Sequence, residues 1–231
     1  MNSTTIEPNG NRNGHKSLAA RITHPGKKRD RAAKQHALIR AATELFASRG
    51  YEATTTREIA ALAGCAEGLI HRYFESKAGL LLALIRGKVS QEVVDLNEKL
   101  RLVPNVGEEI VQLVNWEIDR MWGDREFLRV IVPRALVDPG LGQVITRIGP
   151  LQHAKAIAER VRKFKECRAL PDQEIDALAH FVSVTGFMFG FMRPVVLRQD
   201  RKCARRTATT IARILARSFQ PIPLSANGHI S

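Results

Sequence analysis

The sequence predicts an all-α protein with a small N-terminal three-helix domain followed by a larger helical domain. Three observations lead to this prediction. Residues 54–77 read as two short helices joined by a tight turn, and later segments carry apolar side chains at helical spacing. Of the 231 residues, 44% are hydrophobic but only 6% are aromatic, which favours helices packed through Ala, Leu, Ile and Val. A chain of this length accommodates one small domain and one of ordinary size.

The stretch 54–77 carries the start and stop signals of a helix-turn-helix. Thr54 and Thr55 offer side-chain oxygens to the free N–H groups of a first helix, and Glu58 stands at the capping-box spacing from Thr55. Gly64 ends this helix, because glycine readily adopts the backbone conformation of a helix C-terminus. A second helix follows from about residue 66, and its inward side is expected to consist of Ile70, Tyr73 and Phe74. Such a pair can place its second helix in the DNA major groove.

Residues in and around this turn resemble a known family in both type and spacing. They are Gly50, Tyr51, Ala53, Thr54, Thr55, Ile59, Ala60, Gly68, Tyr73, Phe74, Ser76, Lys77 and Leu80. Over roughly residues 31–81 the chain is similar to the N-terminal domain of the tetracycline-repressor (TetR) family. Beyond residue 90 the resemblance is one of architecture only, and it implies a helical domain that binds a ligand and forms a dimer.

The resemblance also implies which residues meet DNA. Thr55 and Lys77 would hold phosphates, aided by N–H groups at helix N-termini. Gly68 has its own physical reason, because a missing side chain lets the helix approach DNA closely. Arg57 and Arg72 are the candidates for bidentate guanine contacts, each worth about 1–3 kcal/mol of discrimination. The expected major-groove face consists of Ala66, Glu67, Gly68, Leu69, His71, Arg72 and Tyr73.

At two of these positions the residue differs from the one found in many members of the family that the chain resembles. Glu67 stands where lysine is common, and His71 stands where tyrosine is common. A glutamate is repelled by phosphates but accepts a hydrogen bond from cytosine N4, whereas a histidine can gain charge near a polyanion. These residues therefore do not predict which operator sequence the protein reads.

Four segments are expected along the chain. Residues 1–28 predict a flexible basic tail, which either follows DNA phosphates or has no defined role. Residues 29–77 form the DNA-binding domain, residues 78–220 the ligand-binding and dimerisation domain, and residues 221–231 a disordered tail. A basic run at 155–168 predicts a solvated face, or a contact with an anionic ligand or DNA.

The expected helices are 30–49, the pair described above, one from Lys77 to before Pro104, 106–122, 124–137, 141–168 divided near Gly149 and Pro150, 173–197 and 203–219.

The last two expected helices predict a dimer surface. Small residues follow one stripe of the first helix and would let another helix approach closely, which favours a four-helix bundle made by two subunits. The alternative is that this stripe packs inside one chain. The residues concerned are Ala179, Ser183, Gly186 and Gly190, with Ala204, Ala208, Ile211 and Leu215 on the second helix.

Large apolar side chains of the second domain are candidates for a ligand pocket, although any single one of them more often belongs to a plain core. Glu117 lies on the stripe of Ile110, Val114 and Met121, so its carboxylate either points inward and favours a cationic ligand or is partly solvated. The full candidate set is Trp116, Glu117, Met121, Trp122, Phe127, Phe187 and Phe191.

Composition and motifs limit the classes of function that the sequence supports. The net charge of +13 indicates a polyanionic partner, but its excess is spread along the chain and locates no DNA face. Cys65, Cys167 and Cys203 stand far apart, which predicts neither a disulfide framework nor a metal site and suits a reducing cytoplasm. No secretory signal is expected, and no phosphate loop, GxSxG or HExxH motif indicates an enzyme.

We therefore expect a cytoplasmic, ligand-responsive one-component transcriptional regulator without a cofactor. It would bind a pseudo-palindromic DNA operator as a homodimer, have no membrane partner, and be released by a small-molecule effector. Repression relieved by that effector is the direction that the resemblance implies. The alternative is a helical protein-interaction module that does not bind DNA.

Overall fold

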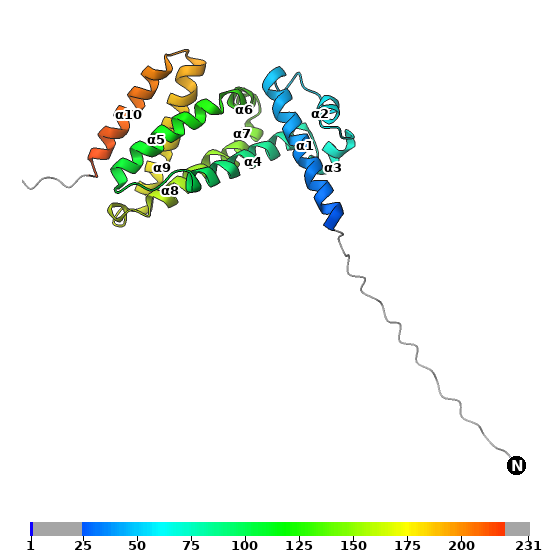
Figure 1. Cartoon of the computed structure of the whole chain (residues 1–231), viewed down its shortest axis with the longest axis horizontal. Helices are drawn as coiled ribbons and strands as arrows, with labels where there is room; N and C mark the ends of the chain where they lie inside the picture. The colour runs from blue at the N-terminus through cyan, green and yellow to red at the C-terminus, as the bar shows by residue number, and fades with distance from the viewer. Residues whose placement is uncertain (2–24, 220–231) are drawn as a thin grey trace, which may run out of the picture.

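The computed structural model describes Met1 and residues 25–219, and every regular element within those residues is helical (Figure 1). The first three helices form a small head: α1 (Pro25–Arg49), α2 (Thr56–Leu62) and α3 (Gly68–Phe74). The long helix α4 (Lys77–Glu98) leads from the head into a larger body. The body consists of α5 (Val106–Gly123), α6 (Arg125–Val137), α7 (Pro139–Ile148), α8 (Pro150–Val161), the short turn η1 (Lys165–Cys167), α9 (Asp172–Phe187), the π-helical segment η2 (Met188–Val196) and α10 (Arg201–Arg217).

This architecture confirms the all-α prediction and corrects two boundaries. Helix α1 begins at Pro25, so residues 25–28 are helical and do not belong to a flexible tail. The helix expected to reach residue 168 ends at Val161 and is followed by η1. Residues 2–24 and 220–231, where the two tails are expected, lie outside the described residues.

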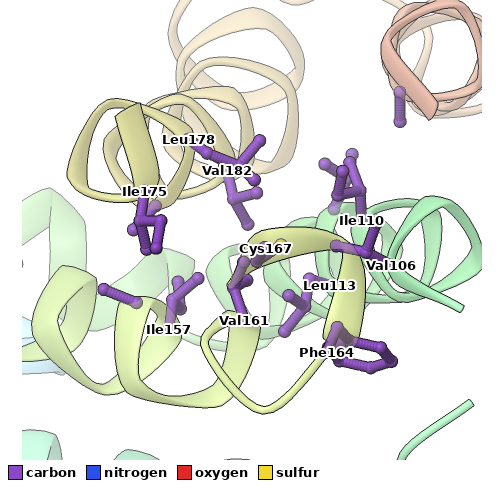
Figure 2. Close-up of a cluster of buried hydrophobic side chains, with 14 of the residues drawn as sticks. Val106, Ile110, Leu113, Ile157, Val161, Phe164, Cys167, Ile175, Leu178 and Val182 are labelled. Carbon is purple, nitrogen blue, oxygen red and sulfur yellow. The ribbon is translucent and has the colours of Figure 1, made fainter. Parts of the chain in front are cut away.

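Two hydrophobic clusters hold the molecule together. One lies in the body, where α5, α8 and α9 meet, and Figure 2 shows Leu113, Val161 and Val182 converging there from these three helices. The other fills the head with Leu38, Phe46, Ile59, Ile70 and Phe74 and continues into α4, α6 and α7. The core of the head is therefore continuous with part of the body.

Helix α9 together with η2 is a single 25-residue stretch, Asp172–Val196, that is long and apolar enough to cross a membrane. Half of its most apolar window is buried inside the protein, against α5, α8 and α10. Core helices of soluble proteins meet the same criterion, so the stretch is weak support for a membrane span.

Candidate DNA-binding surface and effector cavity

The helix-turn-helix is closed by the local signals that the sequence contains. The Thr55 hydroxyl accepts from the Glu58 backbone N–H at 3.2 Å, and Glu58 Oε2 accepts from the Thr55 backbone N–H at 2.8 Å. These hydrogen bonds form the predicted capping box. The pKa of Glu58 is lowered because the Thr55 backbone N–H and the Thr55 hydroxyl both donate to its carboxylate. Gly50 and Gly64 adopt φ values of +83° and +62°, which only glycine reaches without strain. The turn between α2 and α3 is thus built into the sequence.

Helix α3 presents a polar outer face. Ile70 and Phe74 are buried beneath it, whereas Tyr73, expected to face inward, is half-buried with the guanidinium of Arg31 5.3 Å from its ring centre. The Glu67 carboxylate accepts from the Thr56 hydroxyl at 2.6 Å, so it ties the start of α3 to α2. Of the predicted contact residues, the exposed ones are Thr55, Arg57, Ala66, Glu67, Gly68, His71 and Arg72, and Leu69 is half-buried. Their contacts with DNA remain predictions.

Lys77 has a structural role beside its predicted one. Its ammonium donates to the carbonyl oxygens of Tyr51 and Thr54 at 2.9 Å each and lies 4.3 Å from the centre of the Tyr51 ring. It therefore closes the loop before α2, because the amine satisfies two carbonyls that the loop leaves without helical partners. A contact of Lys77 with a DNA phosphate stays a prediction.

A salt bridge joins this loop to the body. Arg134 on α6 donates to Glu52 at 2.9 Å, and its guanidinium lies 5.2 Å from the centre of the Tyr51 ring. Burial raises the pKa of Tyr51. The Tyr51 ring is thus in contact with cations from both sides of the junction between head and body. Sequence patterns did not reveal Arg134, because its partner lies 82 positions away.

A cavity of about 880 Å³ lies inside the half of the body nearest the head. This volume falls within the range usual for small-molecule sites. Its walls come from α4, α5, α6, α7, α8 and α9, and most of them are apolar. Ile85 of α4 borders the cavity and also belongs to the hydrophobic cluster of the head. An occupant would therefore touch the helix that carries the DNA-binding domain.

One end of the cavity is charged. Glu117 is fully buried, and its carboxylate accepts from Arg120 Nη2 at 2.6 Å and from His153 Nε2. Burial alone would raise the pKa of Glu117, but the charges of Arg120 and His153 and their hydrogen bonds together lower it. Arg120 also pairs with Glu92 of α4 at 2.9 Å, and burial raises the pKa of Glu92.

The predicted ligand residues divide into two groups. Met121, Phe127 and Phe187 border the cavity. Trp116, Glu117, Trp122 and Phe191 do not: Trp116 stacks on His153, Trp122 lies against two arginines, and Phe191 is buried beside Phe187. The inward position of Glu117 is confirmed, but its charge is already balanced by Arg120 and His153. Glu117 and Arg120 are three residues apart, the one sequence signal that marks this pair.

The stripe of small residues on α9 is not an outer surface. A methyl group at Gly186 would lie 2.4 Å from Glu117 Cβ, and one at Gly190 would lie 2.6 Å from the Ile118 carbonyl oxygen. Both glycines therefore let α9 and η2 approach α5 within one chain. Ala179, Ala204 and Ala208 are also buried, so the internal alternative is correct for these five positions. Ser183 is half-buried at the cavity.

The outward sides of α9 and α10 carry a few exposed apolar side chains among polar ones. Val184 and Ile214 are 62% and 60% exposed. Ile211 and Leu215, two of the predicted dimer residues, line an open groove between the two helices together with Phe181. In the basic run at 155–168, one side chain departs from the predicted solvated face: Arg160 is buried on Glu109 and donates to the Leu96 carbonyl oxygen at 3.0 Å. The other basic side chains are exposed, as predicted: Lys155, Arg162, Lys163, Lys165 and Arg168.

Part of the chain resembles known bacterial regulatory proteins in sequence. Residues 38–84, which span α2, α3 and parts of α1 and α4, match the profile described as "Bacterial regulatory proteins, tetR family". The fatty acid metabolism regulator protein of Bacillus subtilis is 29% identical over 87 residues, which cover 38% of this chain and 45% of that protein. The HTH-type transcriptional activator FasR of Mycolicibacterium smegmatis is 31% identical over 94 residues, covering 41% and 43%. The matches thus span less than half of these curated relatives.

The resemblance in fold extends further along the chain. A crystal structure of the transcriptional regulator FadR from Bacillus subtilis in complex with stearoyl-CoA superposes with a TM-score of 0.55. The alignment covers 77% of this chain and 96% of that one, at 21% identity, so it shows a shared fold. Residues 38–84 of the chain thus match the tetR family of bacterial regulatory proteins, and the described residues share the fold of a solved regulator.

Proposed function

We propose that this protein is a ligand-responsive one-component transcriptional regulator that acts in the cytoplasm. The observation that carries the proposal is the position of α4. This helix follows directly on the DNA-binding motif, contributes Ile85 to the core of the head, and lines the cavity with that same residue. A molecule that binds the cavity more tightly in one position of α4 than in another would shift the head. The alternative, an interaction module that does not bind DNA, does not explain why α4 links the cavity to the head.

The DNA-binding unit in this proposal is the head, residues 25–77, and the remainder binds effector and partner. Helix α3 would enter the major groove, with Arg57 and Arg72 as candidates for base contacts. The outward sides of α9 and α10 would pair with a second copy, since α9 and α10 expose Val184 and Ile214. A two-fold dimer reads a pseudo-palindromic operator, with half-sites about one helical turn, or a multiple of it, apart.

The effector is proposed to be a small molecule with an apolar body, because most of the cavity wall is apolar. A structural relative binds stearoyl-CoA, which makes this compound a suitable first probe. We propose repression relieved by the effector as the direction. One relative is named an activator, so the direction is tested by whether the effector releases or retains DNA.

The test is a fluorescence-anisotropy titration of the protein against DNA from upstream of its coding region, beside scrambled DNA, at several salt concentrations. We expect tighter binding to the upstream DNA, saturating at two chains per site. Arg72→Ala should weaken this specific binding by about 1–3 kcal/mol, as expected for one base contact. Arg101→Ala, at an exposed arginine between α4 and α5, is the control and should leave the affinity unchanged.

Equal losses in Arg72→Ala and Arg101→Ala would show that Arg72 of α3 does not read a base. Binding of the unmodified protein to neither DNA would favour the interaction module.

A further inference from the structure

Glu67 is an exposed carboxylate on the side of the head that is proposed to meet DNA. It directly precedes α3, and its neighbours Ala66 and Gly68 are exposed as well. A methyl group at Gly68 would find no atom within 4 Å, and the backbone of this glycine is not in the left-handed region. The fold therefore does not require glycine there. Two small neighbours leave the Glu67 carboxylate accessible to a partner that approaches the start of α3.

The position of this carboxylate is fixed by a hydroxyl group of the other helix. Thr56, half-buried at the start of α2, donates to Oε1 of Glu67 at 2.6 Å, a length typical of a hydroxyl that bonds an ionised acceptor. Within the described residues this is the one hydrogen bond that the Glu67 side chain makes. A carboxylate can accept several hydrogen bonds, so Oε2 stays free to accept from a partner while Oε1 is held.

The charge of Glu67 is not balanced by a side chain of the part of the protein that the structure describes. Glu52 and Glu58 pair with Arg134 and Arg49, each at 2.9 Å, whereas none of the ion pairs there involves Glu67. DNA phosphates repel such a carboxylate. A favourable contact with duplex DNA therefore requires a hydrogen-bond donor, and in the grooves the donors are amino groups on the edges of bases.

The pattern of donors and acceptors in the major groove selects one base. Guanine and thymine present only acceptors there, whereas cytosine N4 and adenine N6 donate. Adenine also carries the acceptor N7 beside N6, which repels the second oxygen of a carboxylate and suits an amide instead. Cytosine has no acceptor on its major-groove edge. A carboxylate held at the start of α3 is therefore best matched to cytosine.

We propose that Glu67 determines specificity by accepting a hydrogen bond from N4 of one cytosine in each operator half-site, and that Thr56 is the positioning residue for this contact. The proposal rests on the proposed function of α3 as the helix that enters the major groove. It adds a base to the operator, beside the guanines for which Arg57 and Arg72 are candidates. In a two-fold dimer the two cytosines lie at symmetry-related positions on opposite strands.

The first test is a selection of binding sites from randomised duplex DNA by the full chain. We expect the unmodified protein to select cytosine at one symmetry-related pair of positions. Glu67→Gln should select adenine at the same positions, because an amide matches N6 and N7 together. Glu75→Gln, which removes an exposed carboxylate at the end of α3, is the matched control and should still select cytosine. The inference is overturned if Glu67→Gln selects the same bases as the unmodified protein.

Anisotropy titrations with one selected sequence give the size of the effect. Exchanging the selected C·G pair for T·A should weaken binding of the unmodified protein about tenfold, as is usual for one mismatched pair. The same exchange should cost Glu67→Gln less than about twofold, since its contact is already lost. A tenfold cost in both proteins would assign the cytosine to another residue. If the unmodified protein enriches no sequence at all, the regulator itself is disproved, whereas enrichment without an effect of Glu67 disproves this inference alone.

Thr56→Val tests the positioning role separately. Valine keeps the shape of threonine but removes the hydroxyl, so the carboxylate must be ordered when DNA binds. The cost of exchanging the C·G pair should fall from about tenfold to about threefold, the size expected for ordering one long side chain. The cost of exchanging a selected guanine should not change. Thr43→Val, whose hydroxyl donates to the Ile39 carbonyl oxygen within α1, is the control and should keep the tenfold cost. If Thr56→Val keeps it too, Thr56 does not position the contact.

Discussion

Adding one methyl group at Gly186 tests whether α9 packs closely against α5 within one chain. A Cβ atom there would lie 2.4 Å from Glu117 Cβ and 3.3 Å from the Glu117 backbone carbonyl carbon. Neither atom can turn away by a change of rotamer, because both belong to or adjoin the backbone of α5. Gly87 offers a matched control, since it lies in the interior of α4, is exposed, and has no atom within 4 Å of its added Cβ.

The comparison of the two alanine variants isolates the packing cost. Replacing glycine by alanine inside a helix stabilises it by about 1 kcal/mol, and this gain is common to both sites. Forcing a methyl group into a well-packed contact costs about 1–3 kcal/mol. We therefore expect Gly87→Ala to be more stable than the unmodified protein by about 1 kcal/mol. Gly186→Ala should be less stable than Gly87→Ala by about 1–3 kcal/mol.

Urea unfolding followed by circular dichroism gives both free energies, and measurements at several protein concentrations separate folding from association. The packing argument fails if Gly186→Ala is as stable as Gly87→Ala. If its dissociation constant as a dimer rises instead, the small-residue stripe is the subunit interface after all.

Three further changes test other contacts. Lys77→Met should lower the free energy of unfolding by about 1–3 kcal/mol in urea titrations, because it leaves the carbonyls of Tyr51 and Thr54 unpaired; unchanged stability would show that these bonds are dispensable. The folded-state pKa of Glu117 is lowered from 4.5, so its ionised form stabilises the protein above that pH and this contribution is lost as the pH falls through the folded value. Melting temperatures of Glu117→Gln should accordingly vary less between pH 5 and pH 3 than those of the unmodified protein, and an equal acid loss would contradict this assignment. Val184→Asp should raise the dimer dissociation constant at least about tenfold in sedimentation experiments, because it places a charge on an exposed apolar face; a persistent dimer would place the interface elsewhere.

The helix-turn-helix was predictable because its determinants are local. A capping box needs only Thr55 and Glu58, three positions apart, and a left-handed turn needs only glycine at residue 64. The same holds for helices with one regular apolar stripe. Their exact ends were less predictable, as at Val161, since the apolar pattern continues through Phe164 and Cys167 after the helix has stopped.

The candidate site depends on partners that are distant in sequence. His153 meets Glu117 across 36 positions, so no spacing rule predicts the pair. Small residues on α9 correctly indicate a close helix contact, but a pattern on one helix does not identify its neighbour. At Gly186 the sequence favours a second subunit, with packing inside one chain as the alternative, and only the three-dimensional arrangement places this glycine against α5. Lys77 illustrates a further difficulty, because a lysine beside a DNA-binding motif suits a phosphate contact and a loop closure equally well.

The contacts of α4 suggest where movement of this helix would be felt. Near its C-terminal end, Arg160 donates to the Leu96 carbonyl oxygen and is held by Glu109, so this end is anchored by buried groups. In the C-terminal half of α4, its ties to α5 are ion pairs at the border of the cavity, Glu92 with Arg120 and Lys88 with Asp124. At 1.5 Å per residue, the 22-residue helix is roughly 33 Å long, so a tilt of about 5° about the anchored end would displace the start of α4 by about 3 Å. A ligand that favours one set of these ion pairs would therefore act close to the anchored end, and the small shift there would become larger at the start of α4, which carries the DNA-binding motif.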